Sequence, residues 1–148
     1  MSPEAPDLKQ IFETVVPFAA RSGIKAIEIS ASNNKIMMPL APNVNHVGTM
    51  YAGALFTVAE MMGGAVAMST FGPLGLIPIV KGLNIRFLKP TRTDVTVEYS
   101  MSKEETEKVI KEADETGKGN YVLKLEIKDA NGVVVASSEG FYQVRKMQ

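Results

Sequence analysis

The 148-residue chain contains no cysteine and a single histidine, His46. The absence of cysteine excludes disulfide bonds, thiolate nucleophiles and cysteine-ligated metal sites, and one histidine cannot build a histidine-rich metal centre. We therefore expect no metal and no cofactor. An excess of either charge is also missing, since 16 basic residues balance 16 acidic ones. Such a balance indicates neither a nucleic-acid surface nor a polybasic membrane patch.

Charge is almost absent from one long segment. Between Lys35 and Lys81, Glu60 is the only aspartate, glutamate, lysine or arginine. The run from 47 to 68 is long enough to span a membrane, but a carboxylate near the bilayer centre would cost roughly 2.5–3.5 kcal/mol. We predict instead a helix buried inside a soluble protein, with no membrane span. The N-terminus lacks the basic-then-apolar pattern of a secretory signal, so a cytoplasmic location is expected.

The length fits one domain, residues 1–148, in which residues 1–6 form a loose tail. Apolar residues at helical spacing predict a helix over residues 8–20, capped by Asp7 and stopped at Gly23. Proline at position 17 should bend or shorten this helix. Two short strands, over residues 24–31 and 35–40, are predicted to follow.

A long apolar helix is predicted next, over about residues 51–69, and the glycines and prolines of residues 69–78 indicate a loop. Alternating apolar residues then predict antiparallel strands. These strands cover residues 83–87, 95–101, 120–129 and 133–145. A short charged helix between the second and third of them begins with the capping box of Ser102 and Glu105. Asn131-Gly132 predicts a hairpin between the last two strands.

This order of elements predicts an α+β fold in which the antiparallel sheet curls around the long helix. A helix that is apolar all round needs cover on every side, and a single antiparallel sheet covers only one. We therefore expect a partner subunit to cover the remaining side, which predicts an obligate dimer.

Helical spacing places small residues on the same face as Glu60 and bulky ones on the reverse. The Glu60 face comprises Gly53, Thr57, Gly64 and Ala67, and the reverse comprises Leu55, Val58, Met62 and Val66. Two interpretations remain open. The small residues could serve helix packing across a dimer, with Glu60 bonded to a backbone amide, or the carboxylate could be functional.

The start of this helix offers a second chemical group. The first amides, around residues 51–53, lack intrahelical acceptors, carry partial positive charge and suit a polarised carbonyl. Within one helix they lie about 10 Å from Glu60, at roughly 1.5 Å per residue, which is too far to act on one carbonyl. Two antiparallel copies across a two-fold axis could bring the start of one helix beside Glu60 of the other.

These residues resemble a known family. Asn45-x-x-Gly48-x-x-Tyr51-Ala52-Gly53, followed by Ala59-Glu60, is similar to the motif of hotdog-fold acyl-CoA thioesterases, particularly the PaaI-like group. That motif has His-Gly-Gly where this chain has Tyr-Ala-Gly, and its acid follows nine residues after the histidine, as Glu60 follows Tyr51. The resemblance covers residues 24–145. It implies the hotdog fold, a curved sheet wrapped around a central helix, in a homodimer or homotetramer.

The resemblance also implies hydrolysis of an acyl-CoA or acyl-carrier thioester. Glu60 of one subunit would act as general base or nucleophile, and the Gly53 amide of the other would polarise the carbonyl. Asn45 is expected to orient water, because Gly64 stands where some branches carry a hydroxyl residue. Burial should raise the pKa of Glu60. Further substrate contacts are expected at Gly48, Tyr51, Ala52, Thr57, Asn84, Arg86 and Lys89, the cations facing the phosphates of coenzyme A.

Two other functions fit the same pattern. A non-catalytic hotdog module would bind acyl-CoA or lipid without cleaving it. A dehydratase would need a histidine placed against the helix acid. His46 lies outside that pattern and is expected to be a surface residue.

Overall fold

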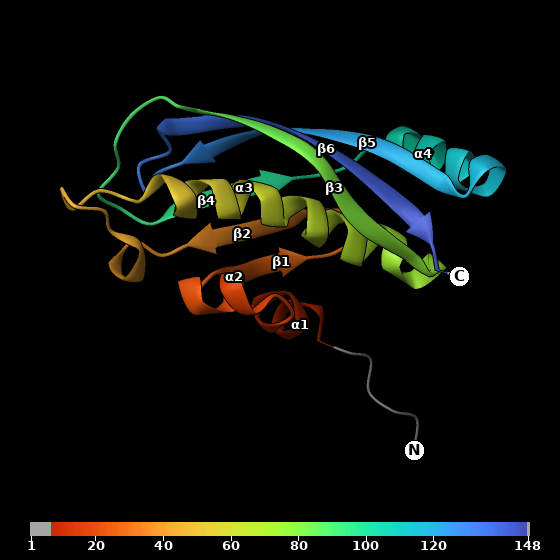
Figure 1. Cartoon of the computed structure of the whole chain (residues 1–148), viewed down its shortest axis with the longest axis horizontal. Helices are drawn as coiled ribbons and strands as arrows, with labels where there is room; N and C mark the ends of the chain where they lie inside the picture. Colours follow the sequence, from red (N-terminus) through yellow and green to blue (C-terminus); the bar gives the residue numbers. More distant parts are fainter. Residues whose placement is uncertain (1–6, 148) are drawn as a thin grey trace, which may run out of the picture.

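One antiparallel sheet curves around a long helix in the computed structural model, which describes residues 7–147 (Figure 1). The expected tail, residues 1–6, lies outside the described residues. The strand order is β1-β2-β4-β5-β6-β3. The strands are β1 Lys25–Ile29, β2 Asn34–Met38, β3 Leu76–Phe87, β4 Val95–Tyr99, β5 Lys118–Lys128 and β6 Val134–Lys146. The predicted α+β architecture is confirmed.

The predicted helix over residues 8–20 is shortened to α1 (Leu8–Thr14), and a second helix, α2 (Pro17–Ser22), follows it. Asp7 caps α1, because its Oδ1 accepts hydrogen bonds from the amides of Lys9 and Gln10 at 3.0 and 3.4 Å. The helix is interrupted before Pro17. Proline suits the first position of a new helix because it has no N–H to leave unpaired. Gly23 ends α2 at φ 80°, in the left-handed region, as predicted.

The long helix α3 (Ala52–Val66) lies against the inner face of the sheet (Figure 1). The helical path continues as a π-helix (Ala67–Phe71) and a 3₁₀-helix (Gly72–Leu74), and β3 begins at Leu76. The prediction of a loop over residues 69–78 is therefore wrong. Pro78 fits within β3 because this strand lies at the edge of the sheet, where a missing N–H is tolerated.

By length and composition alone, the continuous helical run Ala52–Leu74 could cross a membrane. In the fold, however, 72% of its most apolar window is buried. Burial of this kind is consistent with the predicted core helix of a soluble protein.

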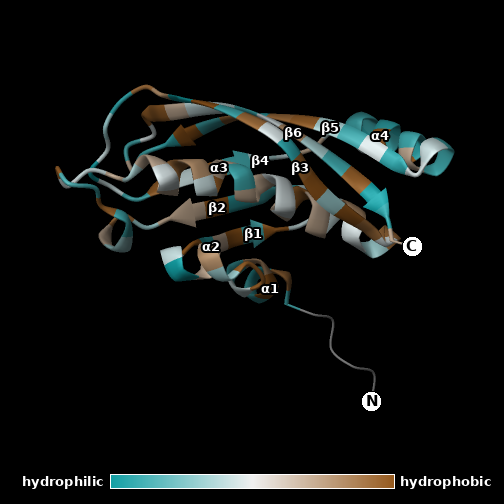
Figure 2. Ribbon diagram, viewed as in Figure 1, coloured by the Kyte–Doolittle hydropathy of each residue, from teal (hydrophilic) through white to brown (hydrophobic). Residues whose placement is uncertain are grey.

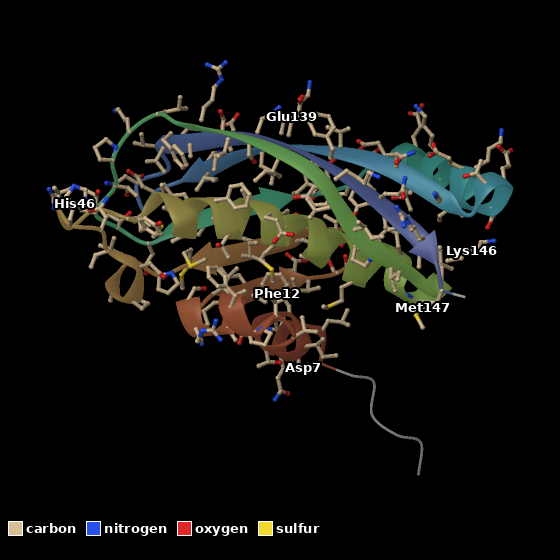
Figure 3. The ribbon with its side chains drawn as sticks, viewed as in Figure 1. Asp7, Phe12, His46, Glu139, Lys146 and Met147 are labelled. Carbon is tan, nitrogen blue, oxygen red and sulfur yellow. The ribbon has the colours of Figure 1, made fainter. Side chains whose placement is uncertain are left out.

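The bulky face of α3 fixes the helix to the sheet. Leu55 is 5% exposed, and Val58, Met62 and Val66 are completely buried, as predicted. Strand β5 alternates buried and exposed residues along its whole length, so one of its faces packs inward. Figure 3 shows Glu139 of β6 on the opposite, outer face of the sheet.

A charged helix, α4 (Lys103–Thr116), joins β4 to β5 and is mostly hydrophilic (Figure 2). The predicted cap at Ser102 is confirmed, since its Oγ accepts a hydrogen bond from the amide of Glu105 at 3.0 Å. The hairpin between β5 and β6 is also confirmed, with Gly132 at φ 81°. Its turn is held by Asp129, whose Oδ1 accepts from the amides of Asn131 and Val133.

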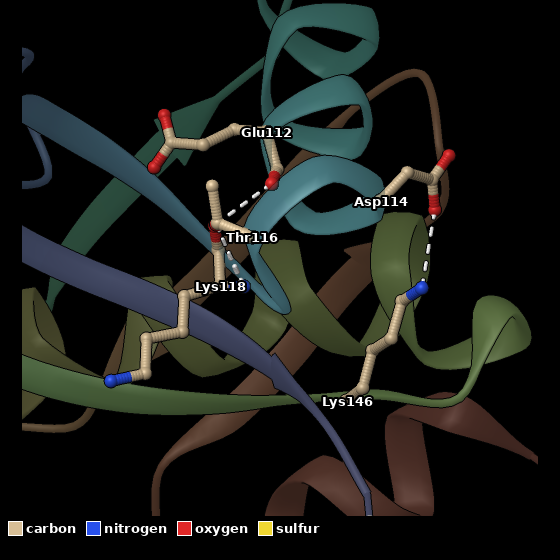
Figure 4. A network of polar contacts seen from close by, with 5 residues as sticks. All are labelled: Glu112, Asp114, Thr116, Lys118 and Lys146. Atoms are coloured by element: carbon tan, nitrogen blue, oxygen red, sulfur yellow. Dashed lines mark hydrogen bonds and ion pairs between the residues drawn. The ribbon is translucent and has the colours of Figure 1, made fainter.

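The end of α4 is tied to the last two strands (Figure 4). The Thr116 hydroxyl donates to the carbonyl of Glu112 at 2.9 Å and accepts from the amide of Lys118 at 3.3 Å. Lys146 Nζ lies 3.6 Å from Asp114 Oδ1. This exposed pair contributes little by itself, so the helix is positioned mainly by its buried residues.

The two edges of the sheet differ. Strand β1 has five residues, and α1 packs beside it. Strand β3 has twelve residues, pairs only with β6 and exposes apolar side chains. Ile77, Val80 and Phe87 are 42%, 45% and 52% exposed. A long apolar edge of this kind is a template for pairing with another chain.

Candidate active site

Glu60 lies on a stripe of α3 that the rest of the chain leaves open. Gly53, Glu60 and Gly64 are partly exposed, and Phe56 is 42% exposed within the same stripe. Thr57 and Ala67, which were expected on this face, are buried. The prediction of a bare face is therefore wrong, because Phe56 stands in it one turn before Glu60.

The Glu60 carboxylate has no hydrogen-bond or ion-pair partner among residues 7–147. Desolvation by burial raises its pKa, as expected, since water cannot fully solvate the charged form. No backbone amide of residues 7–147 donates to this carboxylate, so a single chain does not support the packing interpretation. A partly buried acid without a partner is available for chemistry at the open face.

Tyrosines of the sheet hold the turn of α3 that carries Glu60. The Tyr142 hydroxyl donates to the backbone carbonyl of Glu60 at 3.1 Å, and the Tyr121 hydroxyl donates to that of Gly63 at 3.1 Å. The two rings stack with centroids 5.4 Å apart. A Cβ on Gly63 would overlap the Tyr142 ring, and one on Gly140 would lie 2.6 Å from it. The two glycines therefore let Tyr142 reach the helix backbone.

The start of α3 presents free amides. The N–H groups of Ala54 and Leu55 bond to the Tyr51 carbonyl, whereas those of Ala52 and Gly53 have no acceptor within residues 7–147. Two of the expected donors therefore remain for a ligand, whereas the third, the Tyr51 amide, donates to the Asn43 carbonyl at 2.8 Å. Tyr51 is 59% exposed, and its ring fills the position that a Gly53 side chain would take. The glycine thus makes room for this ring beside the free amides.

The loop before α3 is shaped by Asn45. Its Oδ1 accepts from the amides of Val47 and Thr49 at 3.0 and 3.1 Å, and its Nδ2 donates to the Thr49 hydroxyl at 2.7 Å. Gly48 adopts φ 83°, which a residue with a side chain rarely adopts. The role of Asn45 in orienting water stays a prediction. Its Nδ2 has a second hydrogen that could bind this water.

Only some of the expected substrate contacts lie at this end of α3. Lys89 lines the same groove as Asn45 and Ala52. Asn84 and Arg86 instead alternate with the inward-packed Leu83 and Ile85, and line the outer face of the sheet. The structure therefore does not bring Asn84 and Arg86 to Gly53.

His46 is exposed at the far tip of the loop and points away from the body (Figure 3), so its expected surface position is confirmed. Within the part of the chain that the structure describes, no three histidine or acidic side chains cluster to form a metal site.

The family described as a domain of unknown function, DUF4442, matches residues 6–142. A Pseudomonas aeruginosa protein of unknown function, named a probable thioesterase, is 39% identical with a TM-score of 0.88, covering 95% of this chain and 94% of that one. A protein of unknown function from Chlorobaculum tepidum shares the fold with 20% identity and a TM-score of 0.84, covering 95% of this chain and 93% of that one. A Haemophilus influenzae thioesterase shares it with 14% identity and a TM-score of 0.68, covering 97% of this chain and 93% of that one. No curated protein sequence matches the chain.

Proposed function

We propose that this chain, which belongs to the DUF4442 family of hotdog-fold proteins, hydrolyses the thioester of an acyl-CoA or acyl-carrier substrate. The observation that carries the proposal is the partly buried, unpartnered Glu60 on the same open helix stripe that begins with the free amides of Ala52 and Gly53. The name of the Pseudomonas aeruginosa relative supports the same reaction class. A cytoplasmic location remains part of this proposal.

The proposed site requires a second copy of the chain. Strand β3 offers an unpaired apolar edge, and antiparallel pairing of two β3 strands would join two sheets into one. The open stripes of the two α3 helices would then face each other. A two-fold axis places the same patch on both copies, so the dimer contains two equivalent sites.

The position of the axis follows from the chemistry. Gly53 of one copy can meet Glu60 of the other only if the axis passes beside the residues midway between them, Phe56 and Thr57. Phe56 is exposed at this point, whereas Thr57 is buried and donates its hydroxyl to the Gly53 carbonyl at 2.7 Å. We therefore place Phe56 against its own counterpart at the dimer centre.

In the proposed reaction the thioester carbonyl accepts from the Gly53 amide of one copy. Glu60 of the other takes a proton from water, and the water oxygen bonds to the carbonyl carbon. The C–S bond then breaks, and Glu60 returns the proton to the departing sulfur. Alternatively, Glu60 attacks the carbonyl itself and water cleaves the resulting anhydride. Both routes consume one water and release a thiol and a carboxylic acid.

The test is thiol release from a panel of acyl-CoAs by the wild type, Glu60→Gln and Glu126→Gln. Glu126 is an exposed acid on the outer face of β5 and serves as the matched control. We expect Glu60→Gln to lower turnover by about 10²–10⁴, the usual contribution of a general base, and Glu126→Gln to change nothing.

A loss under tenfold in Glu60→Gln would remove Glu60 from the chemistry. If the wild type releases no thiol from any thioester but still binds acyl-CoA, the protein is a binding module instead of an enzyme.

A further inference from the structure

Residues at the start of α3 line two separate grooves. The first, the α2 groove, lies between α2 and α3 and has a volume of about 210 Å³. Its lining includes Phe18, Arg21, Tyr51, Gly53, Ala54 and Thr57. The second, the turn groove, lies between the loop before α3 and the turn after β3, with a volume of about 330 Å³. Its lining includes Asn45, Thr49, Ala52, Leu55, Phe87 and Lys89.

The two residues with free amides line different grooves. Gly53 lines the α2 groove and its neighbour Ala52 lines the turn groove. A carbonyl bound by these amides could have one substituent in each groove. A thioester carbonyl has two such substituents, the acyl group and the thiol arm.

Aromatic and small residues form the α2 groove. Phe18 and Tyr51, which are 65% and 59% exposed, line it together with the buried Ala54. The Thr57 hydroxyl is already bonded to the Gly53 carbonyl, so it offers no donor hydrogen to a ligand. The Arg21 guanidinium lies 6.0 Å from the centre of the Phe18 ring, as in a cation–π contact. These surroundings suit an apolar group.

Asn43 links the two helices that border the α2 groove. Asn43 Nδ2 donates to the carbonyls of Ser22, at the end of α2, and Pro39, both at 2.8 Å. The Asn43 carbonyl in turn accepts from the Tyr51 amide at 2.8 Å. Asn43 therefore links the end of α2 to the start of α3, the two segments that border the groove.

Each groove has one basic residue in its lining. The cation of the turn groove is Lys89, whereas that of the α2 groove, Arg21, lies over the Phe18 ring. Lysine and arginine are the side chains that bind phosphate groups. The thiol arm of coenzyme A carries phosphates, whereas an acyl group does not.

We propose that the acyl group lies in the α2 groove, with Phe18 as a residue that determines acyl length, and that the coenzyme A arm leaves through the turn groove. This assignment rests on the proposed thioesterase function. With about 210 Å³, the groove is smaller than the roughly 300–1,000 Å³ of sites that enclose drug-sized ligands. The groove therefore suits a short acyl group, and the far carbons of a long acyl chain stay in water.

The test is kcat/KM for straight-chain acyl-CoAs from two to sixteen carbons. We expect kcat/KM to rise by up to about fourfold per methylene buried in the groove, and to reach a plateau well before sixteen carbons. Phe18→Ala should flatten the rise, and Leu74→Ala, a similarly exposed residue far from both grooves, should leave it unchanged. Lys89→Gln should reduce the preference for acyl-CoA over acyl-pantetheine without moving the plateau.

A rise that continues to sixteen carbons would overturn the length limit. If Phe18→Ala instead changes the preference for acyl-CoA over acyl-pantetheine, the two arms are reversed. If the wild type releases no thiol, the thioesterase proposal fails. The groove assignment is then decided by calorimetric binding of the same thioesters to the same variants, with the same plateau expected.

Discussion

The two faces of α3 differ in burial and in chemistry. The reverse face, with Val58, Met62 and Val66, is completely buried against the sheet. The face of Phe56 and Glu60 is partly open and carries the only acid of the helix. One helix thus holds the core together on one side and presents an unpartnered carboxylate on the other.

This difference separates stability from activity. Buried apolar side chains stabilise the fold through the area that they remove from water, so changes on the reverse face should lower stability. The open face contains a carboxylate whose charged form is poorly solvated. Changes there should affect the reaction first, and some should even raise stability.

The largest effect is expected from Glu60→Gln, which should lower turnover by about 10²–10⁴ and at the same time raise the melting temperature near neutral pH. Because burial raises the pKa of Glu60, the folded chain binds this proton more tightly than the unfolded chain does. The free energy of unfolding therefore falls as pH rises from the ordinary glutamate pKa through the raised one. Thermal unfolding at neutral and at acidic pH checks this prediction.

The stabilising effect of Glu60→Gln should disappear at a pH below the ordinary glutamate pKa, where both states are protonated. In the wild type, kcat/KM should fall as pH drops through the raised pKa, because the base becomes protonated. An unchanged melting temperature at neutral pH would contradict the inferred desolvation of Glu60.

Met62→Ala, on the reverse face, should have the opposite profile. Removing a completely buried methionine side chain should lower the free energy of unfolding by about 2–5 kcal/mol. Turnover per folded molecule should stay unchanged, because Met62 faces away from Glu60. Urea denaturation together with activity at low temperature measures both. A large loss of turnover in the folded variant would show that the two faces are not independent.

Tyr142→Phe should have a smaller effect that links the two faces. The variant loses the hydrogen bond to the Glu60 carbonyl, which should cost about 0.5–1.5 kcal/mol of stability. If this bond positions the Glu60 turn, kcat should fall and the pH profile should shift, whereas KM should not change. A stability loss with an unchanged kcat and pH profile would make Tyr142 a purely structural residue.

Phe56→Cys should perturb the molecule least. Helix axes 8–10 Å apart, with Cα atoms about 2.3 Å from each axis, bring facing Cα atoms within disulfide range. Because the chain has no other cysteine, oxidation should yield a covalent dimer through this position alone. Leu74→Cys is the matched control and should stay monomeric on a denaturing gel. Equal cross-linking of both variants would argue against an axis beside Phe56.

Much of the fold could be predicted because its signals are local. Asp7 and Ser102 cap helices through bonds to amides two or three residues away, and alternation along β5 needs only neighbouring residues. The extension of α3 through residue 74 and the early start of β3 were missed. Glycine and proline there suggest a loop, but an edge strand accepts Pro78, and which strand becomes an edge is a tertiary property.

The site was predicted less completely than the fold. Counting helical spacing from Glu60 found Gly53 and Gly64 but overlooked Phe56, which lies four residues earlier on the same stripe. Tyr142 lies 82 residues from Glu60, and no local pattern indicates their hydrogen bond. Phe18 belongs to a helix outside the motif-bearing segment, so only the structure reveals that it lines a groove with Gly53.

The central claim is that Gly53 of one copy and Glu60 of the other form one site. The most direct test mixes two variants, Glu60→Gln and Gly53→Val, each of which should be nearly inactive alone. In a mixed dimer, one site carries both substitutions and the other carries neither. With random reassociation half of the dimers are mixed, so the mixture should regain about one quarter of wild-type turnover.

Recovery of about this size after the two variants are unfolded and refolded together, measured as thiol release, is the result we predict. If the mixture stays as inactive as its components while mixed dimers form, the two residues act within one chain or not at all, and the shared site is contradicted.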